Sequence, residues 1–167
     1  KVLVPLDARS HDQRAVLHMT TRNSGLELGC GMDHAIDFAG ELSVEADAEG
    51  DGAKLVVLAD LEPEQPLRLS KYVAYHWAAN APAGDLVARV DRTLDRAALD
   101  GYDIIEFEHR RHVEDFWARS DIQLDGAPDL QQAVRFNLFE LMQATARGEG
   151  LGVPAKGVTG HGHEGHY

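Results

Sequence analysis

The first half of the chain alternates apolar and polar residues, with glycine- and aspartate-rich turns between the alternating runs. Residues 67–77 show the clearest period of two, and 48–52 are typical of a hairpin connection. Shorter runs with the same strand character cover residues 14–22, 26–30, 42–46 and 54–59. Short strands at this spacing, with no helices between them, are typical of antiparallel sandwiches. We therefore predict that residues 1–81 form part of a β-sandwich.

The pattern changes to a helical period just after Pro82. Apolar residues recur at helical spacing over 85–99, and Gly101 stands where a helix is expected to stop. A second helix is predicted over 104–119, because apolar and aromatic residues gather on one side of it. The chain thus changes from sheet to amphipathic helices within a few residues.

A third helix is predicted over 129–147, with Pro128 near its first turn and Gly148 just past its end. Its apolar residues lie on several faces, which indicates burial inside a body larger than this chain can supply. Asn137 is then a buried polar group that needs a partner. We expect it to hold the following loop rather than to contact a substrate.

Composition excludes some classes of partner. The formal charge of -12 argues against nucleic acid and against an anionic membrane surface, both of which are bound by clustered Lys and Arg. No apolar run reaches the roughly 18 residues that suggest a membrane span. The single cysteine, Cys30, cannot form an intrachain disulfide and suits a reducing compartment. We expect a cytoplasmic protein and, because both ends look cut, a piece of a larger enzyme.

The last 18 residues, 150–167, crowd glycines, histidines, a lysine and a carboxylate into a stretch with no period. Loops that follow a rigid element often carry binding groups, and glycines let the backbone approach a ligand. The spacing of His161, His163 and His166 could hold a transition metal, which would suit a metal-binding regulatory domain. Catalytic zinc sites usually take their ligands from separated rigid elements. We therefore expect at most adventitious metal binding by these histidines, and no dedicated metal site.

Two blocks of residues resemble glycoside hydrolase family 65, which includes maltose, trehalose, kojibiose and nigerose phosphorylases. The first is Trp117-Ala-Arg-Ser-Asp121-Ile-Gln-Leu-Asp-Gly126 followed by Leu130-Gln-Gln-Ala-Val-Arg135-Phe-Asn137-Leu-Phe139. The second is Val153-Pro-Ala-Lys156-Gly157-Val-Thr-Gly160 with Gly165-His166-Tyr167. Upstream, Leu69-Ser-Lys71-Tyr-Val-Ala-Tyr75-His76 and Gly101-Tyr102-Asp103 are similar at matching spacing. The resemblance covers residues 14–167.

The resemblance implies a fold class of a β-sandwich portion followed by an α-helical linker and the first helix of an (α/α)6 barrel. Residues 1–81 would belong to the N-terminal sandwich and 82–126 to the linker. Residues 127–167 would begin the catalytic barrel. This division agrees with the pattern of sheet, amphipathic helices and all-round apolar helix.

The resemblance also implies a reaction: inverting phosphorolysis of an α-linked glucose disaccharide such as trehalose, maltose or kojibiose, giving β-glucose 1-phosphate. Inorganic phosphate is then a co-substrate and no cofactor is needed. The general acid and phosphate loops of the family lie further downstream, so we expect no catalytic residue in this segment, Glu164 included. Lys156, Gly157, His166 and Tyr167 are the expected substrate contacts. The family usually has Glu and Tyr where this chain has His161 and His163, which leaves the disaccharide open.

Two alternatives stay open beside the phosphorylase. One is a family 65 hydrolase that uses water, which would need a second carboxylate to activate it. The other is a non-catalytic carbohydrate-binding sandwich, which we disfavour because Tyr72, Tyr75 and Trp77 fall on both parities of one strand. The expected partners are the disaccharide, phosphate and the rest of the same enzyme, and a homodimer is compatible with the sequence.

Overall fold

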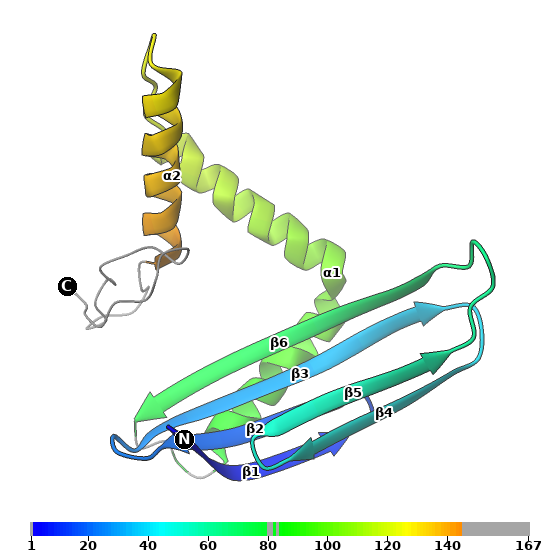
Figure 1. The fold of residues 1–167 in the computed structure, drawn as a ribbon. Helices are drawn as coiled ribbons and strands as arrows, with labels where there is room; N and C mark the ends of the chain where they lie inside the picture. The colour runs from blue at the N-terminus through cyan, green and yellow to red at the C-terminus, as the bar shows by residue number, and fades with distance from the viewer. Residues whose placement is uncertain (1, 80–81, 83, 145–167) are drawn as a thin grey trace. The chain divides into compact units, whose positions relative to one another are not determined.

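The structure is a computed structural model in which residues 2–79, 82 and 84–144 are described. The chain divides into two compact units, Lys1–Phe107 and Glu108–Tyr167, and each is described by itself. Figure 1 shows the strands and helices along the chain. The predicted domain limits 1–81, 82–126 and 127–167 come from the sequence pattern and the family resemblance, not from contacts within the folded chain. They stay predictions.

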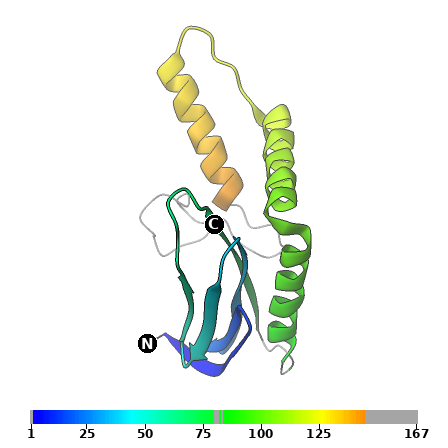
Figure 2. The same cartoon turned by 90° about the vertical axis from the view of Figure 1, so that its right-hand side faces the viewer.

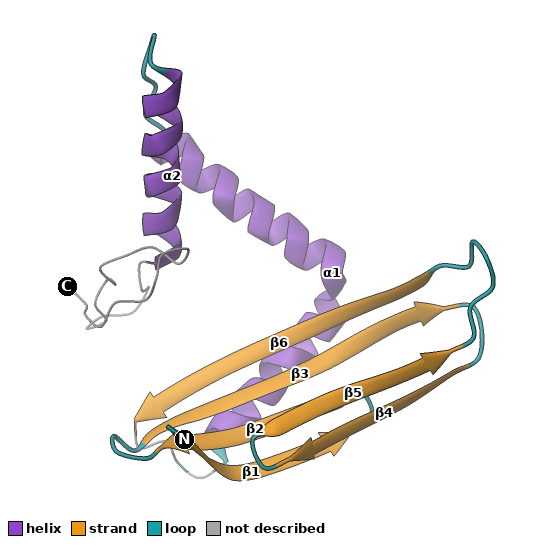
Figure 3. Ribbon diagram, in the orientation of Figure 1, coloured by secondary structure: helices purple, strands orange, loops and turns teal. Residues whose placement is uncertain are grey.

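The first unit holds six antiparallel strands in two sheets (Figure 3). The larger sheet has the order β1-β2-β3-β6, and the smaller one is the hairpin β4–β5. Strand β4 packs against β1 and β2, and β5 packs against β2, so the hairpin begins a second layer. The bounds are β1 Leu3–His11, β2 Arg14–Thr21, β3 Leu26–Phe38, β4 Leu42–Glu49, β5 Gly52–Ala59 and β6 Leu67–Ala79.

Every strand predicted from the residue pattern is present, and the turn at Gly50 is a hairpin connection as expected. The pattern did not predict β1, nor the continuation of β3 from Gly31 to Phe38. The end of β3 gains its strand structure from long-range pairing with the first half of β6. Strand β1 forms a hairpin with β2, in which His11 pairs with Arg14. The β-sandwich expectation is thus confirmed as a mostly β unit with a partial second layer among the described residues.

Helix α1, Asp85–Ser120, is broken at Gly101, whose φ of 73° and ψ of 171° are not helical. The break confirms the stop predicted there, and the segments on either side match the predicted helices 85–99 and 104–119. The Gly101 conformation has a positive φ, which L-residues with a side chain rarely adopt. None of the helices in the described part of the chain is long and apolar enough to cross a membrane.

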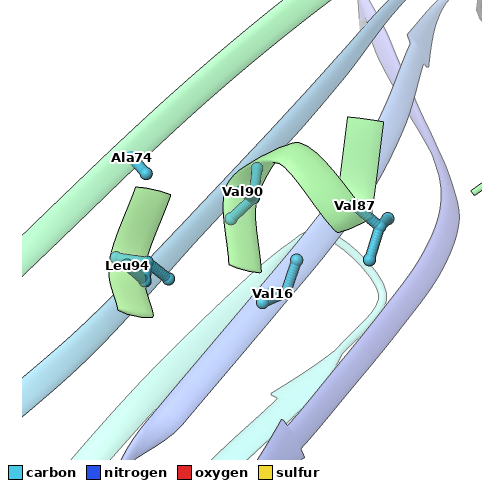
Figure 4. Close-up of a cluster of buried hydrophobic side chains, with 5 residues drawn as sticks. All are labelled: Val16, Ala74, Val87, Val90 and Leu94. Atoms are coloured by element: carbon cyan, nitrogen blue, oxygen red, sulfur yellow. The ribbon is translucent and has the colours of Figure 1, made fainter. Parts of the chain in front are cut away.

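The core of the first unit lies between the start of α1 and one face of the larger sheet (Figure 4). The hairpin β4–β5 lies on the opposite face (Figure 1). Fully burying an aliphatic side chain contributes roughly 1.5–3 kcal/mol, so this small cluster holds the helix on the sheet. Its buried members are Val16, Ala74, Val87, Val90 and Leu94, with Tyr72 packed against them.

Two glycines of β3 let α1 approach the sheet closely. A Cβ atom on Gly31 would lie 2.5 Å from Cγ1 of Val90, and one on Gly29 would lie 3.2 Å from the carbonyl oxygen of Leu86. Because glycine has no side chain, these two positions leave the space that α1 fills. The position of α1 over β3 follows from these two residues.

An ion-pair cluster at Arg14 of β2 ties the helix to the same face. The guanidinium donates to Asp33 of β3 at 2.7 Å and lies 2.7 Å from the Asp95 carboxylate of α1. Burial alone would lower the pKa of Arg14, but the hydrogen bonds to Asp33 and Asp95 outweigh it and raise the pKa. Arg9 pairs with Asp91 of α1 beside this cluster. The helix is thus held by charge as well as by apolar packing.

The second unit contains the last part of α1, a connection through Gly126, and α2, Pro128–Ala144. Figure 2 shows α2 running back beside the last part of α1. Pro128 is the first helical residue, where its missing N–H costs nothing, as predicted. The predicted helix end at Arg147 lies outside the described residues. Large apolar side chains remain exposed on α2, among them Leu130, Phe136 and Leu141.

Candidate functional site

The substrate contacts expected from the sequence, Lys156, Gly157, His166 and Tyr167, lie outside the described residues. The same holds for His161 and His163, so the expectations about these six residues stay predictions. Helix α2 is the described element that leads toward this segment. The candidate site described below therefore consists of α2 and the residues around it.

A bidentate ion pair joins the middle of α2 to the first residue after α1. Arg135 donates from Nε to Oδ1 of Asp121 at 2.7 Å and from a terminal nitrogen to Oδ2 at 2.6 Å. The hydrogen bond from Arg135 holds the pKa of Asp121 below its ordinary value. The planar fork of arginine matches both carboxylate oxygens, which a lysine cannot do. This pair sets the position of α2 relative to the end of α1.

Gln131 holds the connection itself through both ends of its amide. Its Oε1 accepts from the backbone N–H of Leu124 at 2.7 Å, and its Nε2 donates to the carbonyl of Ile122 at 2.7 Å. Sequence reasoning had no signal for this role, because the glutamine is seven to nine residues from its partners. Arg135 and Gln131 both belong to the block that resembles family 65, so their visible role is to position α2.

The expectation that Asn137 is buried and holds the following loop does not fit its surroundings in the structure. Its side chain is exposed, and Nδ2 donates to the carbonyl of Ala133 at 2.9 Å, one turn earlier on the same helix. Much of α2, including Phe136 and Leu141, is itself exposed in the described residues. Burial of this helix inside a larger body stays a prediction. An intrahelical partner therefore satisfies the amide.

A pocket of about 680 Å³ lies between the last part of α1 and the second half of α2. Its volume falls within the usual range for small-ligand sites, and its walls combine apolar side chains with an acid, a cation and an imidazole. Asp115 is the one carboxylate among the lining residues that the structure describes. Acid-base glycoside hydrolysis needs two carboxyl groups, and the described lining of this pocket offers one. The lining residues are His112, Asp115, Phe116, Arg119, Ser120, Leu138, Leu141 and Met142.

The aromatic residues at the end of α1 pack on each other beside this pocket. The rings of Phe116 and Trp117 meet edge to face, with centroids 5.1 Å apart and planes inclined by 71°. Such a pair contributes about 0.5–1.5 kcal/mol beyond its burial. Phe116 also lines the pocket, so the aromatic pair helps to shape its floor.

A second hollow, of about 470 Å³, lies at the break in α1 within the first unit. Gly101, Tyr102 and Asp103, which form one of the family-like motifs, line it together with Arg68 and Asp37. The backbone turn at Gly101 places the Tyr102 and Asp103 side of the motif against the ends of β3 and β6. Its polar groups are largely exposed, and we assign it no ligand.

Metal binding has no candidate in the part of the chain that the structure describes, where no three His, Cys, Asp or Glu side chains gather suitably. His34 is buried and its Nδ1 lies 2.9 Å from the carbonyl of Gln13, and His18 pairs with Glu27 at 2.8 Å. These two histidines have structural partners within the sheet. The His-rich segment proposed as a weak metal site lies outside the described residues.

Comparison with known proteins decides the family. The model of the glycosyl hydrolase family 65 N-terminal domain matches residues 1–116. The chain belongs to glycosyl hydrolase family 65. The matched residues cover the strands and most of α1, whereas the block from Trp117 to Phe139 follows them. The motifs at 69–76 and 101–103 lie inside the matched residues.

Family 65 relatives match the chain over nearly its whole length. An uncharacterised glycosyl hydrolase of Mycobacterium tuberculosis is 38% identical over 165 residues, covering 97% of this chain and 21% of the relative. The alpha,alpha-trehalose phosphorylase of Thermoanaerobacter brockii is 30% identical over 167 residues, covering 100% of this chain and 22% of that enzyme. The chain therefore spans about a fifth of the length of these relatives.

The fold of this family 65 chain has a counterpart among solved structures. A human-microbiome protein assigned as a kojibiose phosphorylase superposes with a TM-score of 0.66 and 16% sequence identity. The superposition covers 86% of this chain and 19% of that protein. At this identity the likeness concerns the fold, and it supports the arrangement of strands and helices described above.

Proposed function

We propose that this chain is part of an inverting phosphorylase that cleaves an α-linked glucose disaccharide and releases β-glucose 1-phosphate. Membership of family 65 supports this proposal, and so does the name of the Thermoanaerobacter brockii relative, alpha,alpha-trehalose phosphorylase, which is 30% identical over 167 residues. Inorganic phosphate is the proposed co-substrate, and the trehalose, maltose or kojibiose type of disaccharide is the proposed substrate.

In this proposal, residues 1–81 belong to the N-terminal sandwich, 82–126 form the linker, and 127–167 begin the (α/α)6 barrel. The exposed apolar side chains of α2 then pack against further barrel helices, because a helix that is apolar on several faces is stable only when surrounded. Asp121 and Arg135 fix the point at which the barrel begins. In this proposal the chain helps to position the barrel and does not supply the general acid.

Lys156, Gly157, His166 and Tyr167 are proposed to line the sugar subsite in the segment after α2. A lysine and a histidine can donate hydrogen bonds to sugar hydroxyls, and a glycine lets the backbone come close to a ligand. The reaction itself needs an acid that protonates the leaving oxygen while phosphate attacks the opposite face of the anomeric carbon. That acid is proposed to lie in the rest of the enzyme.

The deciding experiment measures glucose 1-phosphate and glucose released from trehalose, maltose and kojibiose by the full-length polypeptide, with and without phosphate. The proposal expects phosphate-dependent release of β-glucose 1-phosphate from one of these sugars. Equal release of glucose without phosphate would identify a hydrolase instead. The 167-residue chain alone is the control and should release neither product.

A second candidate, a non-catalytic carbohydrate-binding role, gains support from one observation. Tyr75 and Trp77 lie on the same face of β6 and are 66% and 54% exposed, whereas Tyr72 packs on the other face. The three aromatic residues thus fall on both faces of β6, as their parity indicated, and Tyr75 and Trp77 share the face away from α1. Titration of the chain with maltotetraose, followed by Trp fluorescence, should show saturable quenching that Tyr75→Ala weakens if this role is real.

A further inference from the structure

Two polar side chains of α2 hold the connection that precedes this helix. Arg135 donates two parallel hydrogen bonds to the Asp121 carboxylate, at 2.7 and 2.6 Å. Gln131, one turn earlier, accepts from the N–H of Leu124 and donates to the carbonyl of Ile122, both at 2.7 Å. These two main-chain groups lie in neither helix nor strand, so Gln131 supplies the partners that a regular element would otherwise provide.

Both side chains stand on the face of α2 that is turned toward α1. A helix turns by about 100° per residue, so one stripe is formed by positions 131, 135, 138 and 142. Leu138 and Met142, the later members of this stripe, line the pocket of about 680 Å³ together with Phe116 of α1. The stripe is therefore polar beside the connection and apolar farther along α2, where the two helices lie side by side (Figure 2).

Apolar packing alone does not select this face of α2. Leu130 and Phe136 are each more than half exposed in the described residues. They lie roughly a third of a turn away from the stripe, on either side of it. The hydrophobic effect is non-directional, so it does not distinguish these sides from the one that packs on α1. Hydrogen bonds depend on direction, and the planar fork of Arg135 fits a carboxylate in one orientation. The polar contacts thus decide the rotation of α2 about its own axis.

We propose that Arg135, Asp121 and Gln131 are positioning residues for the sugar subsite, because they set the rotation of α2 from which the following segment continues. The inference rests on the proposed function, in which Lys156 and the other sugar contacts come after α2. Turning α2 by one residue, about 100°, changes the direction in which the chain leaves the helix. Misplacing a group by about 1 Å can cost roughly 100-fold in rate. The three residues act through α2, and the inference needs no uncovered surface.

The two substrates of the proposed reaction give this inference a selective readout. The phosphate-binding groups are expected in the rest of the enzyme, whereas the sugar contacts are expected in the segment after α2. Weakening the contacts of Arg135 should therefore weaken binding of the disaccharide and leave binding of phosphate unchanged. A loss of folded protein alone lowers the apparent kcat and leaves both KM values as they were. The two KM values together separate positioning from stability.

The first test measures kcat and both KM values of the full-length polypeptide with Arg135→Lys, which keeps the charge and loses the fork. We expect KM for the disaccharide to rise about ten-fold and KM for phosphate to stay within about two-fold of the wild-type value. Asp121→Asn should act similarly, and the double variant should be no worse than either change alone, because both break one interaction. Arg96→Lys is the matched control, since Arg96 pairs with Asp100 on α1 at 3.3 Å, and it should change neither KM.

The second test does not depend on the reaction. Amide hydrogen exchange of the full-length polypeptide, followed by mass spectrometry over residues 121–144, reports how firmly α2 is held. Arg135→Lys should raise exchange there, and so should Gln131→Glu, which places a carboxylate oxygen beside the carbonyl of Ile122. Arg96→Lys should leave exchange in these residues unchanged.

The outcomes separate the positioning role from the proposed reaction. Cleavage that needs no phosphate would overturn the phosphorylase, and the KM for the disaccharide would still test the positioning residues. An unchanged KM for the disaccharide in Arg135→Lys, an equal rise in both KM values, or unchanged exchange over residues 121–144 would each overturn the positioning role and leave the reaction standing. A wild-type enzyme that cleaves none of trehalose, maltose and kojibiose would overturn both.

Discussion

Arg135 of α2 and Asp121, the first residue after α1, are joined by two parallel hydrogen bonds of 2.7 and 2.6 Å. Gln131, one turn earlier on α2, holds the same connection through Leu124 and Ile122. These residues belong to the block from Trp117 to Phe139 that resembles family 65. Their visible role is to set α2 against the end of α1.

Protonation of Asp121 should weaken this joint at low pH. The pKa of Asp121 is lowered by the hydrogen bond from Arg135, so its stabilising contribution is fully present above its ordinary, unfolded-state pKa of about 4. It is lost as the pH falls through the lower pKa of the folded state. Melting temperatures of wild type and Asp121→Asn, measured from pH 2 to pH 7, should differ near neutral pH and converge at the acid end. A constant difference across this range would contradict the assignment.

Adding a side chain at Gly31 should destabilise the first unit by forcing α1 away from β3. A Cβ atom there would lie 2.5 Å from Val90 Cγ1, and overpacking of a core costs about 1–3 kcal/mol. Urea unfolding of Gly31→Ala measures the loss. Gly52→Ala is the control, because its nearest neighbour would be at an ordinary 3.8 Å. Adding Val90→Ala to Gly31→Ala should recover part of the loss if the clash is the cause.

Truncation of Leu94 should be far more costly than truncation of Leu99 on the same helix. Leu94 is 1% exposed in the core cluster, and Leu99 is 87% exposed. A buried Leu→Ala change costs about 2–5 kcal/mol, whereas an exposed one usually stays within about 0.5 kcal/mol. Chemical unfolding of the two variants gives the comparison. Similar losses would mean that α1 does not pack on the sheet through this face.

The thiol of Cys30 should react slowly in the folded chain at neutral pH. Burial raises its pKa, so the reactive thiolate is scarce until the pH rises above that value. Alkylation by iodoacetamide, followed by mass spectrometry at pH 7 and pH 10, should be slow at the lower pH and faster at the higher one. The urea-unfolded chain serves as the control and should react faster at pH 7. Rapid alkylation of the folded chain at pH 7 would show that Cys30 is open to solvent.

The sequence pattern predicted those strands and helices whose own residues show the alternation or helical spacing of apolar positions. The alternation over residues 67–77 predicted β6, and Gly101 predicted the break in α1, because each depends on neighbouring residues alone. The end of β3 escaped prediction because its pairing partner in β6 lies far along the chain. Strand β1 escaped prediction because its own residues do not alternate regularly, and its pairing with β2 is irregular between Pro5 and Asp7. The exposure of Asn137 in the described residues could not be predicted for a related reason, since it depends on what surrounds α2.

The sequence by itself determined the family, the order of strands and helices, and the acidic charge that disfavours nucleic acid, because these depend on residue identity and local spacing. The tertiary structure decided which residues meet, such as Gly31 with Val90 and Arg135 with Asp121. Packing and pairing join residues that are distant in the chain. Their energies depend on complementary shapes and charges that appear only when the chain is folded.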